Sequence, residues 1–170
     1  MKAVAVVVVL VFAALAQVTV ASLFPWRGAL PDLALMALVL FAAFRGPVPV
    51  MAGLPILALS LGFVSGRAPS LLLLAYLPLL PLAYALEEAA VPLNRYVRLL
   101  IAGCGTGAWA RLVLALGVIA QGAPFDFSVL ITDLIVPGLF LDAALLTVSY
   151  LPLRAVGCEP QGLALRGGRY

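Results

Sequence analysis

Long apolar segments separated by short polar ones dominate the chain. Within each segment the apolar residues, mostly Leu, Ala and Val, follow one another instead of alternating with polar residues. Continuous apolar segments are typical of helices, whereas the strands of a membrane β-barrel alternate over about 10 residues. We therefore predict six helices, at about residues 3–24, 31–44, 47–64, 69–86, 97–120 and 128–151.

The second predicted helix is shorter than a membrane-spanning helix, which needs about 20 residues. It is bracketed by Pro31-Asp32 at its start and by Arg45-Gly46-Pro47 at its end. Pro31 suits the first turn of a helix, and the charges of Asp32 and Arg45 match the positive and negative ends of the helix dipole. We expect this helix either to include a few flanking residues or to lie where the bilayer thins.

The first apolar segment has an alternative interpretation as a secretory signal peptide. Lys2 would be its charged end, and the Ala-Leu-Ala sequence at 14–16 its cleavage site. We prefer a membrane helix because the segment is long enough to span and ends in Phe-Pro-Trp at 24–26, a helix breaker followed by an interfacial aromatic residue. Kinks or breaks are expected in the third and fourth segments, at the internal prolines Pro49, Pro55, Pro78 and Pro81.

The composition places most of the chain in lipid. Of the 170 residues, 65% are hydrophobic and 10% are charged, which leaves too little polar surface for a soluble domain. We therefore predict an all-α integral membrane protein, with one bundle of six transmembrane helices at residues 1–153 and a short cytoplasmic tail at 154–170. The two cysteines, Cys104 and Cys158, and the lack of histidine favour neither a disulfide framework nor a metal site.

The basic residues predict the orientation of the helices in the membrane. With the N-terminus in the cytoplasm, the inner side holds Lys2, Arg45, Arg95, Arg98, Arg154, Arg166 and Arg169, and the outer side holds Arg27 and Arg67. Because cytoplasmic loops carry the excess of Lys and Arg, we expect both termini in the cytoplasm. The same bias explains the formal charge of +3, so we expect no nucleic-acid binding.

Three ionisable residues fall within predicted spans: Arg111, Asp133 and Asp142. Each costs at least ~2.5 kcal/mol at the centre of a bilayer, so it should face protein and be paired. At 1.5 Å per residue, Arg111 and Asp133 differ in depth by roughly 5 Å on two antiparallel helices. We predict a structural Arg111–Asp133 ion pair and prefer it to a proton or substrate pathway, because histidine is absent. Asp142 projects from the side of the last helix nearly opposite to Asp133, and its role stays open.

The glycine-rich stretch at residues 103–107 looks like a nucleotide-binding loop, but it lies within an apolar helix instead of between a strand and a helix. Gly103 and Gly107 are four residues apart and, with Gly53, indicate close helix contacts, either within the fold or with a partner.

Glu87 and Glu88 are expected on a solvated helix end. Because no nucleophile, base and orienting group occur together, we expect no catalytic residues, no cofactor and no enzymatic activity.

Several short motifs follow one another in a recognisable order. Gln17 near the outer end of the first helix is followed by the loop FPWRGALPDL, and the second helix ends in FRGP. The third helix ends in Ser-Gly, and the last helix contains Pro137 and ends in YLPLR. Over most of the chain this order resembles the rod shape-determining protein MreD family. The residues that carry the resemblance are Pro31, Asp32, Leu33, Arg45, Gly46, Pro47, Ser65 and Gly66.

The chain departs from the family pattern at the end of the third helix. Many members carry a glycine, an aspartate four residues later and then Ser-Gly, where this chain has Ala58, Gly62, Ser65 and Gly66. No role that depends on that aspartate carries over to this sequence.

The resemblance implies a non-enzymatic scaffold in the bacterial inner membrane that helps to maintain rod shape and side-wall peptidoglycan synthesis. The implied partners are the transmembrane helix of MreC, the MreB filament and a glycosyltransferase–transpeptidase pair, and a second copy of the chain is a further candidate. The implied fold is a six-helix bundle similar to the S components of energy-coupling-factor transporters. The alternative function is therefore a substrate-binding S subunit of a vitamin transporter of that class.

Overall fold

The computed structural model describes residues 2–45, 47–88, 94–122 and 126–155. The described residues are almost entirely helical and contain no strand. The first half of the chain forms α1 (Lys2–Thr19), the short 3-10 turn η1 (Ala21–Leu23), α2 (Leu33–Arg45) and α3 (Pro47–Ser65). The second half forms α4 (Pro69–Tyr76), α5 (Leu79–Glu88), α6 (Arg95–Ile119), α7 (Phe127–Val129), the π-helical segment η2 (Leu130–Ile135) and α8 (Val136–Ala155).

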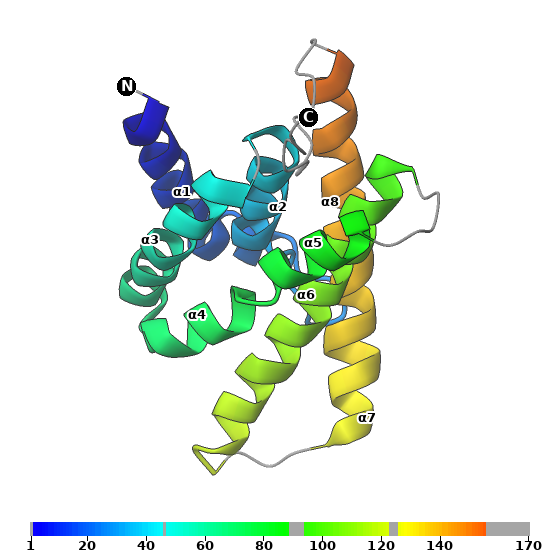
Figure 1. Cartoon of the computed structure of the whole chain (residues 1–170). Coiled ribbons are helices and arrows are strands. Elements are labelled where there is room, and N and C mark those ends of the chain that lie inside the picture. The colour runs from blue at the N-terminus through cyan, green and yellow to red at the C-terminus, as the bar shows by residue number, and fades with distance from the viewer. Residues whose placement is uncertain (1, 46, 89–93, 123–125, 156–170) are drawn as a thin grey trace, which may run out of the picture.

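These elements correspond to the six predicted helices. The predicted fourth helix is broken at Leu77-Pro78 into α4 and α5, because Pro78 has no backbone N–H with which to continue the hydrogen-bond ladder. Pro55 lies inside α3 without ending it. The predicted last helix is α7, η2 and α8 in one continuous rod (Figure 1). Of the predicted tail at 154–170, the structure describes residues 154 and 155, which extend α8, and the remainder lies outside the described residues.

Three segments are long and apolar enough to cross a membrane: Val6–Leu23, Tyr96–Ile119 and Phe127–Ala155. Three further apolar helices are shorter, at Leu33–Phe44, Val50–Ser65 and Pro69–Leu82. The chain is therefore an all-α, multi-pass membrane protein. The apolar outer surface agrees with this, since Phe12 on α1 and Phe63 on α3 are 67% and 84% exposed, as lipid-facing side chains would be.

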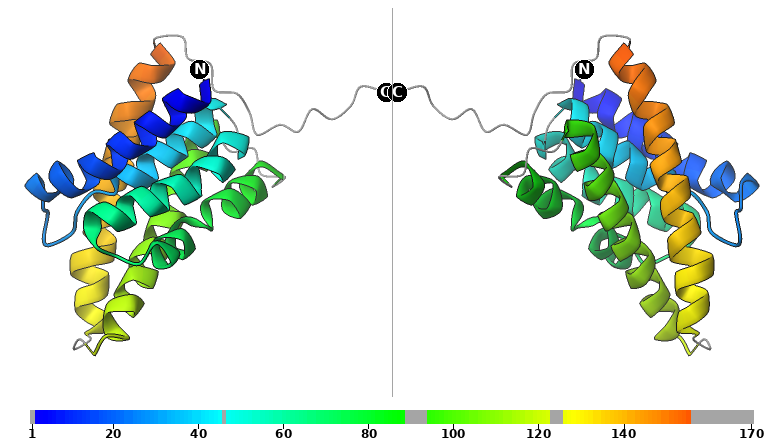
Figure 2. Two further views of the ribbon diagram at one scale, coloured as in Figure 1. Left: turned by 90° about the vertical axis from the view of Figure 1, so that its left-hand side faces the viewer. Right: turned by 90° about the vertical axis from the view of Figure 1, so that its right-hand side faces the viewer.

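The short helix α2 lies at the centre of the molecule and packs against α1, α3, α6 and α8 (Figures 1 and 2). Most of its side chains are buried, including Ala34, Leu35, Met36, Leu38, Val39, Ala42 and Ala43. A helix that is apolar on every side is buried on every side, which explains why its sequence shows no polar face. In contrast, the far ends of α6 and α7 project beyond the other helices (Figures 1 and 2).

A tight turn before α2 brings the chain back into the bundle. Arg27 and Gly28 both have positive φ, at 52° and 87°. Trp26 and Ala29 flank them and exchange two backbone hydrogen bonds of 3.0 Å, in the manner of a two-residue hairpin turn. Trp26 then packs edge-on against Phe140 of α8, with ring centroids 6.3 Å apart. The turn is thus anchored to α8 before α2 begins.

The positive φ of Gly28 gives a first prediction. Gly28→Val should lower the thermal stability in detergent, because a β-branched side chain at positive φ costs roughly 1–2 kcal/mol. Gly28→Asn is the matched control and should stay close to wild type, since asparagine tolerates this conformation. A Cβ at Gly28 would meet no atom within 4 Å, so steric clash cannot account for a difference between the two variants. Equal melting temperatures would show that the turn is not needed.

Candidate functional site

The centre of the bundle holds a buried ion pair between α6 and α8. Arg111 Nη1 donates to Asp142 Oδ2 at 2.7 Å, and the two side chains are 9% and 0% exposed. The predicted Arg111–Asp133 pair is therefore wrong. Asp133 is exposed on η2, where its Oδ1 accepts a hydrogen bond of 3.2 Å from Thr132 Oγ1. The expectation that Asp133 and Asp142 point in different directions is consistent with this arrangement.

The direction in which helical side chains lean explains the choice of partner. Side chains on a helix tilt toward its N-terminus. Arg111 on α6 therefore leans away from the α6–α7 connection, whereas Asp142 on the antiparallel α8 leans toward it, and the two side chains converge. Asp133 lies closer to the connection and leans further toward it, so it diverges from Arg111. The depth estimate from the rise per residue, which favoured Asp133, does not include this tilt.

Two glycines make room for the ion pair. A Cβ added at Gly138, one turn before Asp142 on α8, would lie 2.2 Å from Arg111 Nε and 2.5 Å from its Cζ. A Cβ at Gly107 would lie 3.0 Å from Asp142 Oδ2 and 3.1 Å from Arg111 Nη1. The guanidinium therefore occupies a slot that only glycine at 138 leaves open. Sequence reasoning missed Gly138, although a glycine four residues before an intramembrane aspartate was a usable signal.

The ion pair also holds the backbone that leads into α2. Asp32 N–H donates to the second oxygen of Asp142, Oδ1, at 2.8 Å. Arg111 Nη2 donates to the carbonyl of Leu30 at 3.3 Å. A buried ion pair stabilises only when its remaining donors and acceptors are also satisfied. Here the backbone of residues 30–32 supplies those partners.

Gln17 of α1 and Asp32 cap the first turn of α2. Gln17 Oε1 accepts hydrogen bonds from the backbone N–H groups of Leu33 (2.6 Å) and Ala34 (3.3 Å), and its Nε2 donates to the Pro31 carbonyl at 3.0 Å. Asp32 Oδ1 accepts from the N–H of Leu35 at 2.9 Å, as an N-cap residue does. The first N–H groups of a helix have no partner within the helix, and these side chains supply partners that water would supply at a surface.

Tyr76, at the end of α4, completes the cluster. Its hydroxyl donates toward both oxygens of Asp32, at 3.1 Å and 3.2 Å, and the side chain is buried. We call the resulting set, which joins five helices, the α2 polar network: Gln17, Asp32, Tyr76, Arg111 and Asp142.

The side chains of the α2 polar network use their hydrogen bonds to join helices to one another. Its carboxylates accept hydrogen bonds from backbone N–H groups, a phenol and a guanidinium, and its amide binds backbone on both sides. Within the described residues, no group of three His, Cys, Asp or Glu side chains could hold a metal ion. Cys104 on α6 is a free thiol, and Cys158 lies outside the described residues.

The three glycines predicted to mark close contacts lie at helix contacts inside the fold. A Cβ at Gly53 of α3 would lie 2.6 Å from Leu10 Cδ1 of α1. A Cβ at Gly103 of α6 would lie 3.3 Å from Leu146 Cδ1 of α8 and 3.5 Å from Val39 Cγ2 of α2. Gly107 faces the ion pair, as described above. Of the two alternatives left open by the sequence, these positions therefore serve internal packing.

The remaining motif residues lie at helix ends. Arg45 is the last residue of α2 and Pro47 the first of α3, while Gly46 lies outside the described residues. Ser65 Oγ donates to the Leu61 carbonyl at 2.6 Å, and Gly66 follows α3 with φ of +68°. This is the left-handed conformation that commonly ends a helix.

Packing leaves no room for a side chain at Gly62, the position that the sequence comparison with the MreD pattern singled out. A Cβ at Gly62 would lie 2.7 Å from Pro69 Cγ and 3.0 Å from the Arg67 carbonyl oxygen. A carboxylate at this position would require α3 and α4 to move apart.

Comparison of the chain with protein-family models, with curated proteins and with solved structures finds no match.

The Arg111–Asp142 pair gives a second prediction. Asp142→Asn should lower the free energy of unfolding in detergent by about 3 kcal/mol or more, because it leaves the guanidinium buried without a counter-ion. Asp133→Asn is the matched control and should change stability little, since Asp133 is exposed. Removing both charges, with Arg111→Met and Asp142→Leu, should recover part of the loss. Equal losses in Asp142→Asn and Asp133→Asn would contradict the pairing.

The slot at Gly138 gives a third prediction. Gly138→Ala should lower the melting temperature more than Gly53→Ala does. The added methyl at 138 meets the guanidinium core at 2.2 Å, whereas the methyl at 53 meets the flexible end of Leu10. Both variants replace glycine by alanine within a helix and gain the same helix propensity. The difference between their melting temperatures therefore reports the contact that each added methyl group makes. A Gly138→Ala variant as stable as wild type would mean that Arg111 does not occupy the slot.

Proposed function

We propose that this chain is a non-enzymatic membrane scaffold of the bacterial cell-elongation machinery, which binds MreC directly and helps to maintain rod shape and side-wall peptidoglycan synthesis. The resemblance of its ordered motifs to the MreD family is the basis of the proposal. The proposed location is the inner membrane, with both termini in the cytoplasm. MreB and the glycosyltransferase–transpeptidase pair are the proposed further members of the assembly.

One structural observation supports a scaffold over an enzyme: the α2 polar network uses its hydrogen-bonding groups to join helices. Arg111 and Asp142 bind each other and the backbone before α2, and Gln17 and Asp32 cap α2 itself. A catalytic acid or base must reach substrate, whereas Arg111 and Asp142 are buried and bound to each other, and the half-buried Gln17 and Asp32 are bound to the backbone of α2. Groups that fix the relative positions of five helices are what a rigid binding platform requires.

The outward face of α1 is the surface that we propose for the MreC helix. Only 17% of the residues in the α1 span are buried, against 44% in the α6 span. Val8, Val11 and Leu15 recur at helical spacing on this face and are 46%, 36% and 41% exposed. β-branched side chains have few rotamers to lose on packing, so a valine-rich face favours helix–helix contact. Gly103 and Gly107 are not available to a partner, because the fold itself uses them.

The fourth prediction tests this interface by site-specific photocrosslinking. A photoreactive phenylalanine analogue at Val8 or Leu15 should crosslink to co-expressed MreC from the same organism. The same analogue at Phe63 on α3 or Val148 on α8 is the matched control, because these side chains are also exposed and apolar, at 84% and 68%. Co-purification of MreC with the wild-type protein should accompany the crosslinks.

The outcome can contradict the proposal at two levels. Crosslinks to MreC from the control positions alone would move the interface away from α1 and leave the scaffold function intact. The absence of both crosslinks and co-purification would remove MreC as the partner. Tight binding of a vitamin by the purified protein would instead favour the alternative, a substrate-binding S subunit of an energy-coupling-factor transporter.

A further inference from the structure

Trp109 of α6 lies at an unusual depth for a tryptophan in a membrane protein. In the span Tyr96–Ile119 it is about 20 Å from the first residue and about 15 Å from the last, at 1.5 Å per residue. Tryptophan is typical of the membrane interface, where its N–H can reach water or headgroups. Trp109 is 42% exposed, so at this depth its ring faces lipid. Its indole N–H therefore needs an acceptor within the protein.

The acceptor is the backbone carbonyl of Leu74 on α4, which lies 3.2 Å from Trp109 Nε1. In a continuous helix this carbonyl would accept the N–H of the residue four positions later, which here is Pro78. Proline has no N–H, and a backbone carbonyl without a donor is costly in lipid. One hydrogen bond between α6 and α4 thus satisfies both the indole N–H and the carbonyl that Pro78 cannot reach.

The connection between α4 and α5 has the features of a hinge. The backbone ladder is present on both sides of it. The Leu77 N–H donates to the Leu73 carbonyl at 2.9 Å, and the Leu82 N–H donates to the Pro78 carbonyl at 3.0 Å. Between these two bonds, Pro78 and Pro81 have no N–H to donate, and such gaps are the usual cause of a bend. Figure 1 shows α4 and α5 as two separate helices joined by a short connection.

The two helices that meet at this connection are held differently. Near its end α4 is bound twice by side chains, because Tyr76 donates to Asp32 and Trp109 donates to Leu74. In contrast, α5 contributes no residue to the α2 polar network. Among its described side chains Leu79 is buried, and the others are half-buried or exposed. Packing against α6 therefore holds α5, and the hydrogen bonds that fix its neighbours do not extend to it.

The glycine at 105 shows how closely α5 packs on α6. A Cβ at Gly105 would lie 2.8 Å from Leu82 Cδ2, so the Leu82 side chain rests on the backbone of α6. If Trp109 did not donate to the Leu74 carbonyl, the replacement donors would be the first N–H groups of α5 or water. The first would require α5 to turn, and the second would require the connection to open. Either change would move Leu82 away from Gly105.

We propose that the α4–α5 connection is a hinge at which α5 moves relative to α4, and that Trp109 is its latch. The indole N–H takes the place of the N–H that Pro78 lacks, and it holds the end of α4 on α6. While this bond is made, α5 stays packed at Gly105. When it is broken, α5 turns and the Leu74 carbonyl finds another donor. The proposal does not depend on the scaffold function.

The test measures amide hydrogen exchange of the full-length protein in lipid nanodiscs. Removing the indole N–H with Trp109→Phe should make the amides of α5 exchange roughly fivefold faster, as the loss of one neutral hydrogen bond would give. Trp26→Phe is the matched control, because it also removes an indole but packs on Phe140 of α8. It should leave exchange in α5 unchanged.

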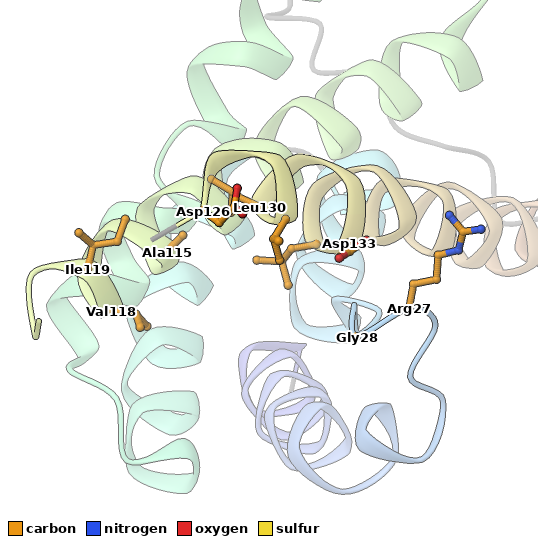
Figure 3. Close-up of a pocket in the computed structure, with 10 residues that line it drawn as sticks. Arg27, Gly28, Ala115, Val118, Ile119, Asp126, Leu130 and Asp133 are labelled. Atoms are coloured by element: carbon orange, nitrogen blue, oxygen red, sulfur yellow. The ribbon is translucent and has the colours of Figure 1, made fainter. Parts of the chain in front are cut away.

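A second segment of the same protein serves as an internal reference. The helix formed by α7 and η2 carries Asp126, Leu130 and Asp133, which line a pocket bordered by α6 and by the loop at Arg27 (Figure 3). Exchange in this helix should be the same in Trp109→Phe and in wild type, because local opening exposes only the amides of the element that moves.

Pro78→Ala tests whether Trp109 replaces the missing backbone donor. Leu77 already has helical dihedral angles, at φ −54° and ψ −39°, so an alanine at 78 can continue the helix and donate to the Leu74 carbonyl. In this background Trp109→Phe should accelerate exchange in α5 by less than twofold. Both backgrounds lose the same ring area, so the difference between them reports the hydrogen bond.

Three outcomes would overturn the proposal. Equal acceleration in the wild-type and Pro78→Ala backgrounds would show that Trp109 acts through packing and not as a replacement donor. Equal acceleration in α5 and in the reference helix would show that Trp109 stabilises the whole fold and no hinge. Unchanged exchange in the Trp109→Phe variant would show that the connection does not open. The melting temperature of each variant shows whether it has folded.

Discussion

The start of α2 is a helix N-terminus in the interior of a membrane protein, and the rest of the bundle is organised to satisfy it. In lipid, a backbone N–H without a partner costs several kcal/mol, and no water is present to bind it. Gln17, Asp32 and Asp142 accept hydrogen bonds from the backbone N–H groups of residues 32–35. Arg111 neutralises Asp142, and Tyr76 binds Asp32. Each of these residues comes from a different helix, so satisfying one helix end fixes five helices.

This constraint also explains the short length of α2. Side chains accept the hydrogen bonds of its first backbone N–H groups. The helix can therefore begin in the interior and does not need to reach the membrane surface. The turn at Arg27 and Gly28 provides the geometry, because it brings the chain back into the bundle immediately before Pro31. Gly107 and Gly138 provide the space, because larger residues would meet the Arg111–Asp142 pair. With its polar groups used at the centre, the protein presents an apolar outer surface to lipid or to neighbouring helices.

The sequence by itself determined the class of structure. Continuous apolar segments predicted helices, and their number and approximate bounds agree with the six helices observed, including a break at Pro78 in the fourth. Local chemistry also predicted Asp32 at the start of α2, since a carboxylate favours the positive end of the helix dipole. Pro31 was expected in the first helical turn, but it lies two residues before Leu33, where α2 begins. These features depend on residues close together in the chain, and local patterns determine them. The resemblance to the MreD family likewise rests on local motifs.

Only the tertiary structure decided which distant groups meet. The sequence predicted that Arg111 pairs with an acidic residue, but it offered two intramembrane candidates, Asp133 and Asp142. The direction of side-chain tilt and the slot at Gly138 selected Asp142. The roles of Gln17 and Tyr76 could not be predicted from the sequence either. Their hydrogen bonds join residues 14 and 44 positions apart, and such pairs produce no repeating pattern in the sequence. Long-range pairing depends on how helices pack, and packing is a property of the whole bundle.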